Sequence, residues 1–480
     1  MVGAGARVHG PRGDSKPDRR PQHERESYWG GRVRARNPRN PGARPHDLGR
    51  LVDKNWNEAS ADVLVVGAGA AGLWAAERAA REGRSVLLLE KTARTGSKVL
   101  ASGGTRCNLT TTLEPRAAAA LFGKVGGRFL ETAFRVLPPT GVRARFEELG
   151  VPTETAPLEK IFPTSGRAVD VRDALERAGV AAGVRIELDC PVEQVERGAD
   201  GVWTLAIAGG RTARAPRVIL CPGGKSYPRT GTTGDGYRWL DDLGLEEVEP
   251  VPALAPLASS AAWVRELAGI SIQEGEARLV DGAGVVIGRR RRPVLFTHRG
   301  LSGPGAMDLS EHVARARVAA DRARTRVDLA LRIDLAPDVS ADALRALIQA
   351  AGARPGGPTL SRVLPFEVPR RVLEAVARQA DLRESDPRAN QLEREARTRL
   401  VDALKGLAVP VDDTLGFDQA EVTAGGLALH EVDAGSLRVK KHAGLYAIGE
   451  ILDLQGPIGG LNFQAAFATA ELAGRAAASD

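Results

Sequence analysis

The chain has 480 residues, of which 43% are hydrophobic, and this is enough to bury a large core and to form two or three domains. No apolar run approaches the roughly 20 residues that span a bilayer, and the N-terminus lacks the apolar segment of a secretory signal. The three cysteines, Cys107, Cys190 and Cys221, show no C-x-x-C spacing. This argues against a zinc site or a dithiol oxidoreductase, and it favours a reducing compartment. We therefore expect a cytoplasmic protein with no metal site and no membrane partner.

The positive charge is concentrated at the N-terminus. The first 50 residues carry 12 of the 67 Lys and Arg but only 5 of the 60 Asp and Glu, which accounts for the whole net charge of +7. Residues 1–58 are rich in Arg, Pro, Gly and Asn and show no periodicity, so we expect a disordered basic tail. Such a tail either binds nucleic acid or is a passive extension. Because the remaining residues are neutral, the passive extension is favoured and no nucleic-acid partner is expected.

Residues 61–90, ADVLVVGAGAAGLWAAERAAREGRSVLLLE, predict a strand, a glycine-rich turn, a helix and a second strand. The turn has the G-x-G-x-x-G spacing at Gly67, Gly69 and Gly72, which allows a tight turn, a close approach to a diphosphate and close packing of helix on strand. Glu90 ends the second strand, where an acid binds ribose hydroxyls. This unit predicts a dinucleotide site, and other segments must decide between FAD and NAD.

The next segment, residues 91–112, is polar, rich in glycine and too long for a simple turn. Arg94, Lys98 and Arg106 add positive charge beside the predicted diphosphate site, and the backbone at Ser102 and Gly103 offers N–H groups to a ligand. A loop of this length inside an α/β unit is usually functional.

Residues 115–183 predict helices and turns, including a helix over residues 168–182. Residues 184–188 and 192–195 predict strands, with Val192 beside the adenine, and residues 201–220 predict a hairpin followed by a buried strand. That strand runs into CPGGKSYPRTGTTGDGY, in which Gly223 and Gly224 bring the chain back to the cofactor.

From about residue 250 to 335, short apolar strands alternate with turns, which predicts a β-rich insert. Four arginines, residues 289–292, form either a solvated edge or an attractive patch for an anionic substrate. Helical periodicity follows over residues 340–407, with Ser340 as an N-cap and Gly352 as a stop signal.

The C-terminal segment carries a second cofactor signal. Residues 445–448 predict a buried strand that ends at Gly449 and Glu450, and Gly459 and Gly460 precede a helix. The acid can accept hydrogen bonds from ribityl hydroxyls, and the helix N-terminus can stabilise negative charge on a flavin ring. A Rossmann enzyme that uses only NAD does not need this segment, so FAD is favoured.

Four blocks resemble one family. They are GSKVLASGGTRCNLT, the segment CPGGKSYPRTGTTGDGY, VLFTHRGLSGPGAMDLS, and the C-terminal GPIGGLN segment. Together they resemble the HI0933-like (BaiN/RdsA-type) NAD(P)/FAD-dependent oxidoreductases of the two-dinucleotide-binding-fold flavoprotein superfamily. Thr105 stands where the family usually has a third glycine, and Cys221 and Pro222 stand in place of Ala-Thr.

The resemblance implies an α/β fold in which a Rossmann-type FAD-binding domain carries a β-rich insert domain and a small helical inserted subdomain. The expected order is a tail (1–58), the FAD-binding domain (61–250), the insert (251–339), the helical subdomain (340–407), the return of the insert (408–435) and the end of the FAD-binding domain (436–480).

The expected activity is hydride transfer between non-covalently bound flavin and a small organic substrate of the enone, amine or amino ketone class. The alternative is an RNA-associated flavoprotein related to tRNA-modifying FAD enzymes and tethered by the basic tail. No second G-x-G-x-x-G follows a strand, so no dedicated NAD(P)H domain is expected, and NAD(P)H is one candidate for a transient electron donor. The sequence gives no oligomeric state.

His298, in the third block, is the candidate catalytic residue, with a structural histidine as the alternative. Cys107 is expected to be either a small packed residue or a redox thiol. The residues expected to bind FAD are Gly67, Gly69, Ala70, Ala71, Gly72, Glu90, Lys91, Lys98, Ser102, Gly103, Arg106, Cys107, Asn108, Val192, Gly223, Gly224, Gly449, Glu450, Gly459, Gly460 and Asn462.

Overall fold

The computed structural model describes residues 56–479, and a parallel sheet of five strands forms its centre. The strands lie in the order β23-β11-β2-β3-β7, and every neighbouring pair is parallel. They are β2 (Val63–Val66), β3 (Val86–Leu89), β7 (Arg185–Glu187), β11 (Arg217–Leu220) and β23 (Leu445–Ala447). β2 and β3 are buried along their whole length, as expected for parallel strands covered on both faces.

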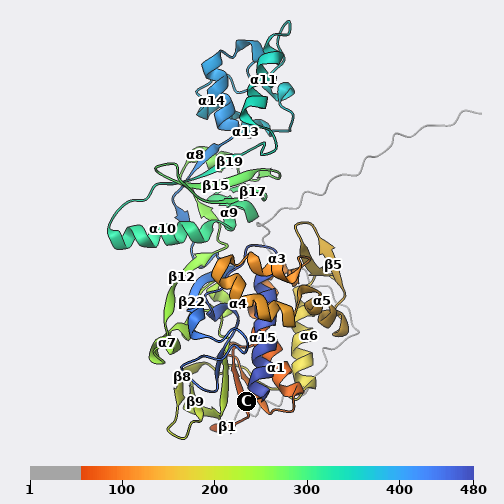
Figure 1. Ribbon diagram of the computed structural model, residues 1–480, viewed down its shortest axis with the longest axis vertical. Helices are drawn as coiled ribbons and strands as arrows, with labels where there is room; N and C mark the ends of the chain where they lie inside the picture. Colours follow the sequence, from red (N-terminus) through yellow and green to blue (C-terminus); the bar gives the residue numbers. More distant parts are fainter. Residues whose placement is uncertain (1–55, 480) are drawn as a thin grey trace, which may run out of the picture. The chain divides into compact units, whose positions relative to one another are not determined.

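Helices cover this sheet. α1 (Ala70–Arg81) follows the first glycine turn and packs against both α15 (Leu461–Ser479) and α6 (Ala168–Ala181) (Figure 1). Trp74 of α1 packs on Phe467 of α15 with ring centroids 5.0 Å apart, and its Nε1 donates to Glu471 Oε2 at 2.8 Å. The C-terminal helix is therefore fixed to the first helix of the chain, and the predicted α/β fold is confirmed.

A second sheet of the order β1-β10-β9-β8 borders the first. It contains β1 (Glu58–Ser60), β8 (Val192–Arg197), β9 (Trp203–Ile207) and β10 (Arg211–Ala215). Trp56 is buried before β1, beneath the guanidinium groups of Arg185 and Arg211. Residues 56–58 at the end of the expected tail therefore have a defined structure, whereas residues 1–55 lie outside the described residues.

The region 115–183 contains a β-hairpin that the sequence analysis missed. β5 (Thr153–Ala156) and β6 (Lys160–Pro163) pair with each other, and β6 also pairs with β4 (Thr110–Thr111). The helices are α3 (Pro115–Ala120), α4 (Gly123–Val136), α5 (Pro139–Glu148) and α6. The expectation of helices and turns alone was wrong because β5, with the sequence TETA, is polar and faces its partner without an apolar side.

The β-rich insert contains two sheets, of the orders β14-β17-β18-β13-β21 and β16-β15-β19-β20. Their strands are β13 (Leu257–Ala258), β14 (Ser271–Ile272), β15 (Glu276–Asp281), β16 (Val286–Arg290), β17 (Val294–Thr297), β18 (Gly300–Ser302), β19 (Leu329–Asp334), β20 (Leu407–Val411) and β21 (Asp413–Thr414). α8 (Ala262–Glu266), α9 (Pro304–Met307) and α10 (Ser310–Ala323) accompany them. The sequence analysis missed α10, in which charged residues interrupt the apolar ones and only four of the 14 residues are buried.

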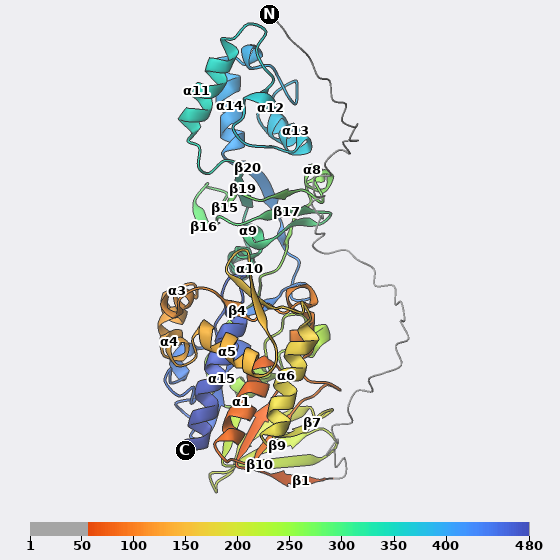
Figure 2. The same cartoon turned by 90° about the vertical axis from the view of Figure 1, so that its right-hand side faces the viewer.

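A two-stranded sheet of β12 (Glu247–Ala253) and β22 (Val422–Leu427) follows α7 (Asp235–Asp242) and joins the two regions of the chain. The helical segment consists of α11 (Ala341–Gly352), α12 (Leu360–Val363), α13 (Arg370–Gln379) and α14 (Arg394–Leu404), which pack together (Figure 2). Ser340 caps α11, since its Oγ accepts from the Ala343 N–H at 3.1 Å.

The buried apolar residues form two large clusters, and the predicted domain boundaries stay a prediction. One gathers buried residues from 56–245 and 427–477, and the other gathers buried residues from 257–411. Among the described residues, no helix is both long enough and apolar enough to cross a membrane.

Candidate functional site

The first glycine turn is shaped by contacts that exclude a side chain at two of its three glycines. Gly67 has a φ of 106°, and a Cβ there would lie 2.4 Å from the carbonyl oxygen of Cys221. A Cβ on Gly72 would lie 1.8 Å from the Gly67 carbonyl oxygen. A Cβ on Gly69 would meet no atom within 4 Å. The outer glycines therefore serve packing, while the middle one borders open space at the start of α1, beside Ala70 and Ala71.

Glu90 stands at the end of β3, with its carboxylate directed at this turn. Its Oε2 accepts from the Ala68 N–H at 2.8 Å, and its Oε1 accepts from the N–H and Oγ1 of Thr92 at 2.9 and 2.8 Å. A carboxylate has about four acceptor positions, so the half-buried Glu90 keeps capacity for a hydroxyl of a ligand. Val192 begins β8 two residues after Cys190, whose N–H donates to the Glu90 carbonyl at 2.9 Å.

Lys98 and Glu450, which are far apart in the sequence, form an ion pair. Lys98 Nζ lies 2.6 Å from Glu450 Oε2 and 2.6 Å from Ser226 Oγ. Ser226 Oγ donates to Glu450 Oε1 at 2.6 Å, and the Thr423 N–H donates to the same oxygen at 2.8 Å. Four segments of the chain therefore meet at one carboxylate.

The sequence analysis selected Lys98 and Glu450 but missed Ser226 and Thr423. Ser226 follows the second glycine pair and could have been found there. Thr423 lies in β22, where nothing in the local pattern marks it. A Cβ on Gly224 would lie 2.3 Å from Thr423 Oγ1, and one on Gly223, whose φ is 81°, would lie 2.7 Å from Thr232 Cγ2.

Lys98 lies in α2 (Ser97–Ala101), which the 3-10 turn η1 (Ser102–Thr105) follows. Gly103, Gly104, Thr105 and Cys107 have positive φ angles, with 70° at Thr105, so a β-branched residue occupies a conformation that favours glycine. Ser102 Oγ donates to the Val99 carbonyl at 2.7 Å. Cys107 is fully buried, and burial raises the pKa of its thiol to about 12. A thiol with this pKa stays neutral, which supports a packing role.

Two further candidates in this region contact other parts of the protein. The Arg106 guanidinium lies 4.3 Å above the Phe162 ring and 3.9 Å from Glu154. Lys91 Nζ donates to Thr233 Oγ1 at 2.6 Å and forms an ion pair with Asp235 in the first turn of α7.

The C-terminal turn leads into α15 and is held against the same region. A Cβ on Gly460 would lie 2.2 Å from the Thr110 carbonyl oxygen and 2.9 Å from Asn108 Oδ1. A Cβ on Gly459 would meet no atom within 4 Å. The Asn462 side chain forms hydrogen bonds with the backbone of the same turn. It accepts from the Gly456 N–H at 2.8 Å and donates to the Gly456 carbonyl at 2.9 Å.

The two Gly-rich ends of the chain approach each other. A Cβ on Gly449 would lie 3.1 Å from Ala71 Cβ, so the end of β23 meets the start of α1. Asn108 Oδ1 accepts from the Ile161 N–H at 3.1 Å, which ties the segment after η1 to β6.

His298 lies in the exposed turn between β17 and β18. Among residues 56–479, no hydrogen bond or ion pair joins its side chain to another residue. The catalytic role of His298 stays a prediction.

A cavity of about 600 Å³ lies beside the turn that precedes α15. Its apolar wall includes Leu113, Leu121, Phe122, Leu158 and Leu254. Its polar residues are Glu159, Arg290, Arg291, Arg292, Asp308, Glu311, His312 and Gln455. Cavities of 300–1,000 Å³ that combine apolar walls with a few polar groups are typical of small-molecule sites. The sequence analysis pointed to this region through Gly459 and through three of the four arginines, Arg290, Arg291 and Arg292.

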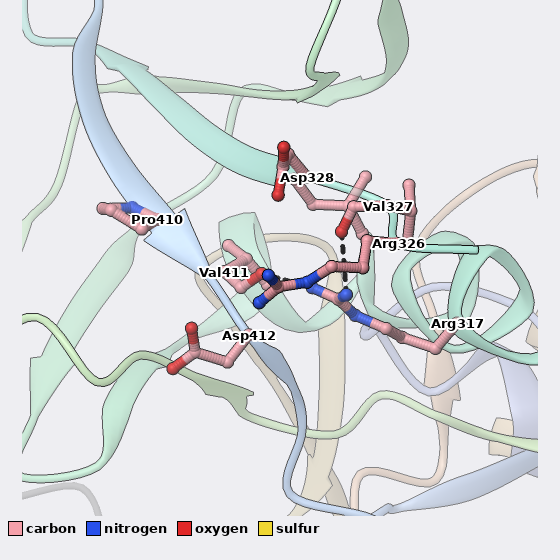
Figure 3. A pocket seen from close by; sticks show the side chains of 8 residues that line it. Arg317, Arg326, Val327, Asp328, Pro410, Val411 and Asp412 are labelled. Carbon is pink, nitrogen blue, oxygen red and sulfur yellow. Dashed lines mark hydrogen bonds between the residues drawn. The ribbon is translucent and has the colours of Figure 1, made fainter. Parts of the chain in front are cut away.

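A second hollow, of about 370 Å³, lies on the β-rich insert around Arg317 and Arg326 (Figure 3). Arg317 donates to the carbonyls of Val327 and Val411 at 2.8 and 2.9 Å. Its guanidinium therefore joins two strand ends.

The model for the HI0933-like protein Rossmann domain matches residues 61–476. The chain belongs to this family. The resemblance seen in the sequence is confirmed, and the chain is an FAD-dependent oxidoreductase with a Rossmann-type FAD-binding domain.

Two relatives match most of this chain. The chain is 31% identical over 425 residues to the 3-dehydro-bile acid delta(4,6)-reductase of Clostridium scindens, which covers 86% of this chain and 98% of that protein. It is 28% identical over 416 residues to the ribosomal RNA dihydrouridine synthase of Escherichia coli, which covers 85% of this chain and 96% of that protein.

Among solved structures, a match is the 3-ketosteroid-delta4-(5alpha)-dehydrogenase from Rhodococcus jostii RHA1. It is 17% identical, has a TM-score of 0.49, and the match covers 89% of this chain and 99% of that protein.

Burial shifts the pKa values of two residues that line the cavity, Asp308 and His312, and of two charged groups that interact with Asp308, Glu421 and Lys160. Burial raises the pKa of Asp308 to about 6, against the lowering effects of the Ile458 N–H, Arg290, Arg292 and Lys160. Burial also raises the pKa of Glu421, to about 7, and lowers the pKa of Lys160. The pKa of His312 is lowered by burial, which favours its neutral form.

Proposed function

We propose that this flavoprotein reduces a carbon–carbon double bond conjugated with a carbonyl group in a small organic substrate. The observation that carries the proposal is the shared turn: residues 456–459 line the cavity and also lead into the C-terminal helix at the predicted flavin site. A substrate in the cavity is therefore next to the segment that we expect to contact the flavin ring. FAD, when bound, supplies the two-electron chemistry.

The described residues fit FAD. Gly69 and Gly459 border open space at two helix starts, and Glu90 keeps an acceptor position at the end of β3. We propose that α1 and its glycine turn bind the diphosphate, that Glu90 binds a ribose, and that Lys98 and Glu450 hold the polar part of the cofactor near the ring. The remaining predicted contacts, from Lys91, Ser102, Arg106, Asn108, Val192 and Asn462, are part of the same proposal.

The names of the two relatives support the reaction class. A 3-dehydro delta(4,6) bile acid and uridine both hold a double bond conjugated with a carbonyl, and each relative is named for an enzyme that saturates such a substrate. Amine or amino ketone oxidation, the other predicted class, uses the same flavin site in the opposite direction.

The residues around the cavity have definable tasks in this reaction. Leu113, Leu121 and Phe122 exclude water and hold the carbon skeleton. Arg290 and Arg292 supply positive charge for an anionic or carbonyl oxygen of the substrate. NAD(P)H is our proposed electron donor, docking transiently against the flavin, and a cytoplasmic location is proposed with it.

A second candidate function is the reduction of uridine in RNA, which the E. coli relative favours. The neutral charge of residues 51–480 argues against tight binding of RNA phosphates by this part of the chain. Residues 1–55 of the basic tail expected to tether RNA lie outside the described residues.

An anaerobic experiment distinguishes these candidates. The FAD-loaded protein is reduced with dithionite and mixed with 2-cyclohexenone, with 4-androstene-3,17-dione or with an unmodified ribosomal RNA fragment, and flavin reoxidation is followed by absorbance. We expect reoxidation by an enone and recovery of the saturated ketone by mass spectrometry. Reoxidation by RNA alone would favour the second candidate, and no reoxidation by any probe would contradict the proposal. A parallel titration of the oxidised protein with NADH and NADPH tests the proposed donor.

A further inference from the structure

Asp308 is the acidic residue of the cavity that is most closely tied to the predicted flavin site. It follows α9, in the same sequence block as His298, and only 2% of its side chain is exposed. Its Oδ1 accepts from the Ile458 N–H at 2.9 Å, one residue before Gly459. One carboxyl oxygen is therefore fixed against the turn that leads into α15.

Within residues 56–479, the second oxygen of Asp308 accepts no direct hydrogen bond. Oδ2 lies 3.7 Å from Arg290 Nε, which is beyond hydrogen-bond distance, and Asp308 is among the residues that line the cavity. Oδ2 is not one of the fully buried side-chain atoms that lack a partner in residues 56–479, so it keeps some access to solvent on the cavity side. This arrangement leaves one position of the carboxyl available to a substrate.

Charged groups from every neighbouring element act on this carboxyl. Arg290 of β16, Arg292 before β17 and Lys160 of β6 are the cations, and Glu421 before β22 is the nearby acid. The other titratable groups lining the cavity are Glu159, Arg291, Glu311 and His312. Arg292 and Arg291 are engaged with Glu159 and Asp338 in ion pairs, so neither neutralises Asp308 by direct contact.

We infer that Asp308 is the catalytic acid of the proposed reduction, giving its proton to the substrate in the cavity. The inference rests on the proposed function. FAD, when bound and reduced, would supply the hydride for one alkene carbon and would be left oxidised. Asp308 gives its proton to the adjacent carbon, where the electron pair of the double bond forms the new C–H bond. The resulting carboxylate regains a proton from solvent, which restores the starting state.

Burial raises the pKa of the Asp308 carboxyl and the nearby cations lower it, and the resulting pKa suits a proton donor. A general acid works best with a pKa near the working pH, and burial places the pKa of Asp308 near 6, above its ordinary value. His298, the acid or base expected from the sequence, lies in an exposed turn without a hydrogen-bond partner in the described structure. Asp308 therefore replaces His298 as the proton donor of this block.

The variant Asp308→Asn tests the inference because its amide oxygen can still accept from the Ile458 N–H while the acid is lost. We expect reoxidation of the dithionite-reduced flavin by 2-cyclohexenone or 4-androstene-3,17-dione to slow by about 10²- to 10⁴-fold, with loss of the pH dependence near pH 6. Reduction by dithionite and FAD affinity should stay unchanged. Asp342→Asn, at a position with 98% of its side chain exposed, is the matched control and should behave as wild type.

A spectroscopic readout that needs no turnover accompanies this test. The absorbance of oxidised FAD in the wild-type protein should titrate with an apparent pKa near that of Asp308, and this titration should be absent in Asp308→Asn. If Asp308→Asn does not fold, Asp308→Glu is used instead. If the absorbance of FAD bound to Asp308→Glu titrates with the same midpoint as in the wild-type protein, the inference is overturned.

The outcomes separate the inference from the proposed function. If the wild-type protein reacts with neither enone, the proposed function fails. If the wild type reacts and Asp308→Asn reacts equally fast with the same pH profile, the inference is overturned. If His298→Gln loses the reaction while Asp308→Asn reacts normally, His298 is the proton donor and the inference about Asp308 is overturned.

Discussion

Lys98 Nζ and Glu450 Oε2 lie 2.6 Å apart, although the two residues are separated by 352 positions in the sequence. Both side chains are mostly buried, with 24% and 19% of their surfaces exposed. The pair joins the loop after the first Rossmann strands to the end of β23. It therefore couples the two parts of the chain that we propose to enclose FAD.

The first prediction concerns this ion pair. Lys98→Met leaves the Glu450 carboxylate with only neutral donors, and the loss of a charged hydrogen bond costs about 1.5–3 kcal/mol. We expect FAD affinity to fall at least about tenfold, which corresponds to about 1.4 kcal/mol. Fluorescence titration of the flavin-free protein measures the change. Lys441→Met, which breaks a 2.6 Å pair with Glu431, should lower stability and leave FAD affinity unchanged. Equal FAD affinity in the two variants would contradict the proposed role.

The second prediction separates packing from cofactor binding in the first glycine turn. Gly72→Ala forces a Cβ against backbone at 1.8 Å and should destabilise the flavin-free protein by about 3 kcal/mol or more. Gly69→Ala meets no protein atom within 4 Å and should change stability by less than about 0.5 kcal/mol while weakening FAD binding. Urea unfolding and FAD titration measure the two effects. Normal FAD affinity in Gly69→Ala would show that the diphosphate does not approach this glycine.

The third prediction concerns the strained position in η1. Thr105 has a φ of 70°, and such a conformation costs a non-glycine residue about 1–3 kcal/mol. Thr105→Gly removes this strain but increases the entropy of the unfolded chain, so we expect a net stabilisation of about 0.5–1 kcal/mol. Thr112→Gly, at an exposed position without a positive φ, should destabilise instead. Thermal unfolding of both variants provides the comparison. If Thr105→Gly is less stable than wild type, the inference that the backbone at Thr105 is strained is wrong.

The fourth prediction is a pH dependence of stability caused by Glu421. Its folded pKa is raised to about 7 from 4.5, so between these values the folded protein holds a proton that the unfolded protein releases. The free energy of unfolding therefore falls as the pH rises through this window, and the loss is complete above it. Glu421→Gln stays neutral and should exceed wild type in stability above about pH 7 by about 1–2 kcal/mol.

Denaturant unfolding of the flavin-free protein at pH 5 and pH 8 measures this difference. Glu114→Gln replaces an exposed glutamate and should show the same difference from wild type at both pH values. A Glu421→Gln difference that does not grow with pH would mean that the Glu421 carboxyl is not held in its neutral form.

Local patterns in the sequence were sufficient for the cofactor fold. The apolar run of β2, the spacing of Gly67, Gly69 and Gly72, and the acid at Glu90 act over short distances, so their structure follows from neighbouring residues. The same holds for the strand and glycines that precede α15. The strand β5 escaped prediction because it is polar, and the helix α10 escaped it because only four of its residues are buried.

By itself the sequence determined the Rossmann-type flavoprotein, and it predicted which residues begin and end its cofactor site. Only the tertiary structure decided which side chains meet. It brought Thr423 and Ser226 to Glu450, placed Asp308 at the cavity and left His298 in an exposed turn. The physical reason is that a glycine turn is specified by its own backbone conformation. A buried charge cluster, in contrast, depends on contacts between segments that are hundreds of residues apart.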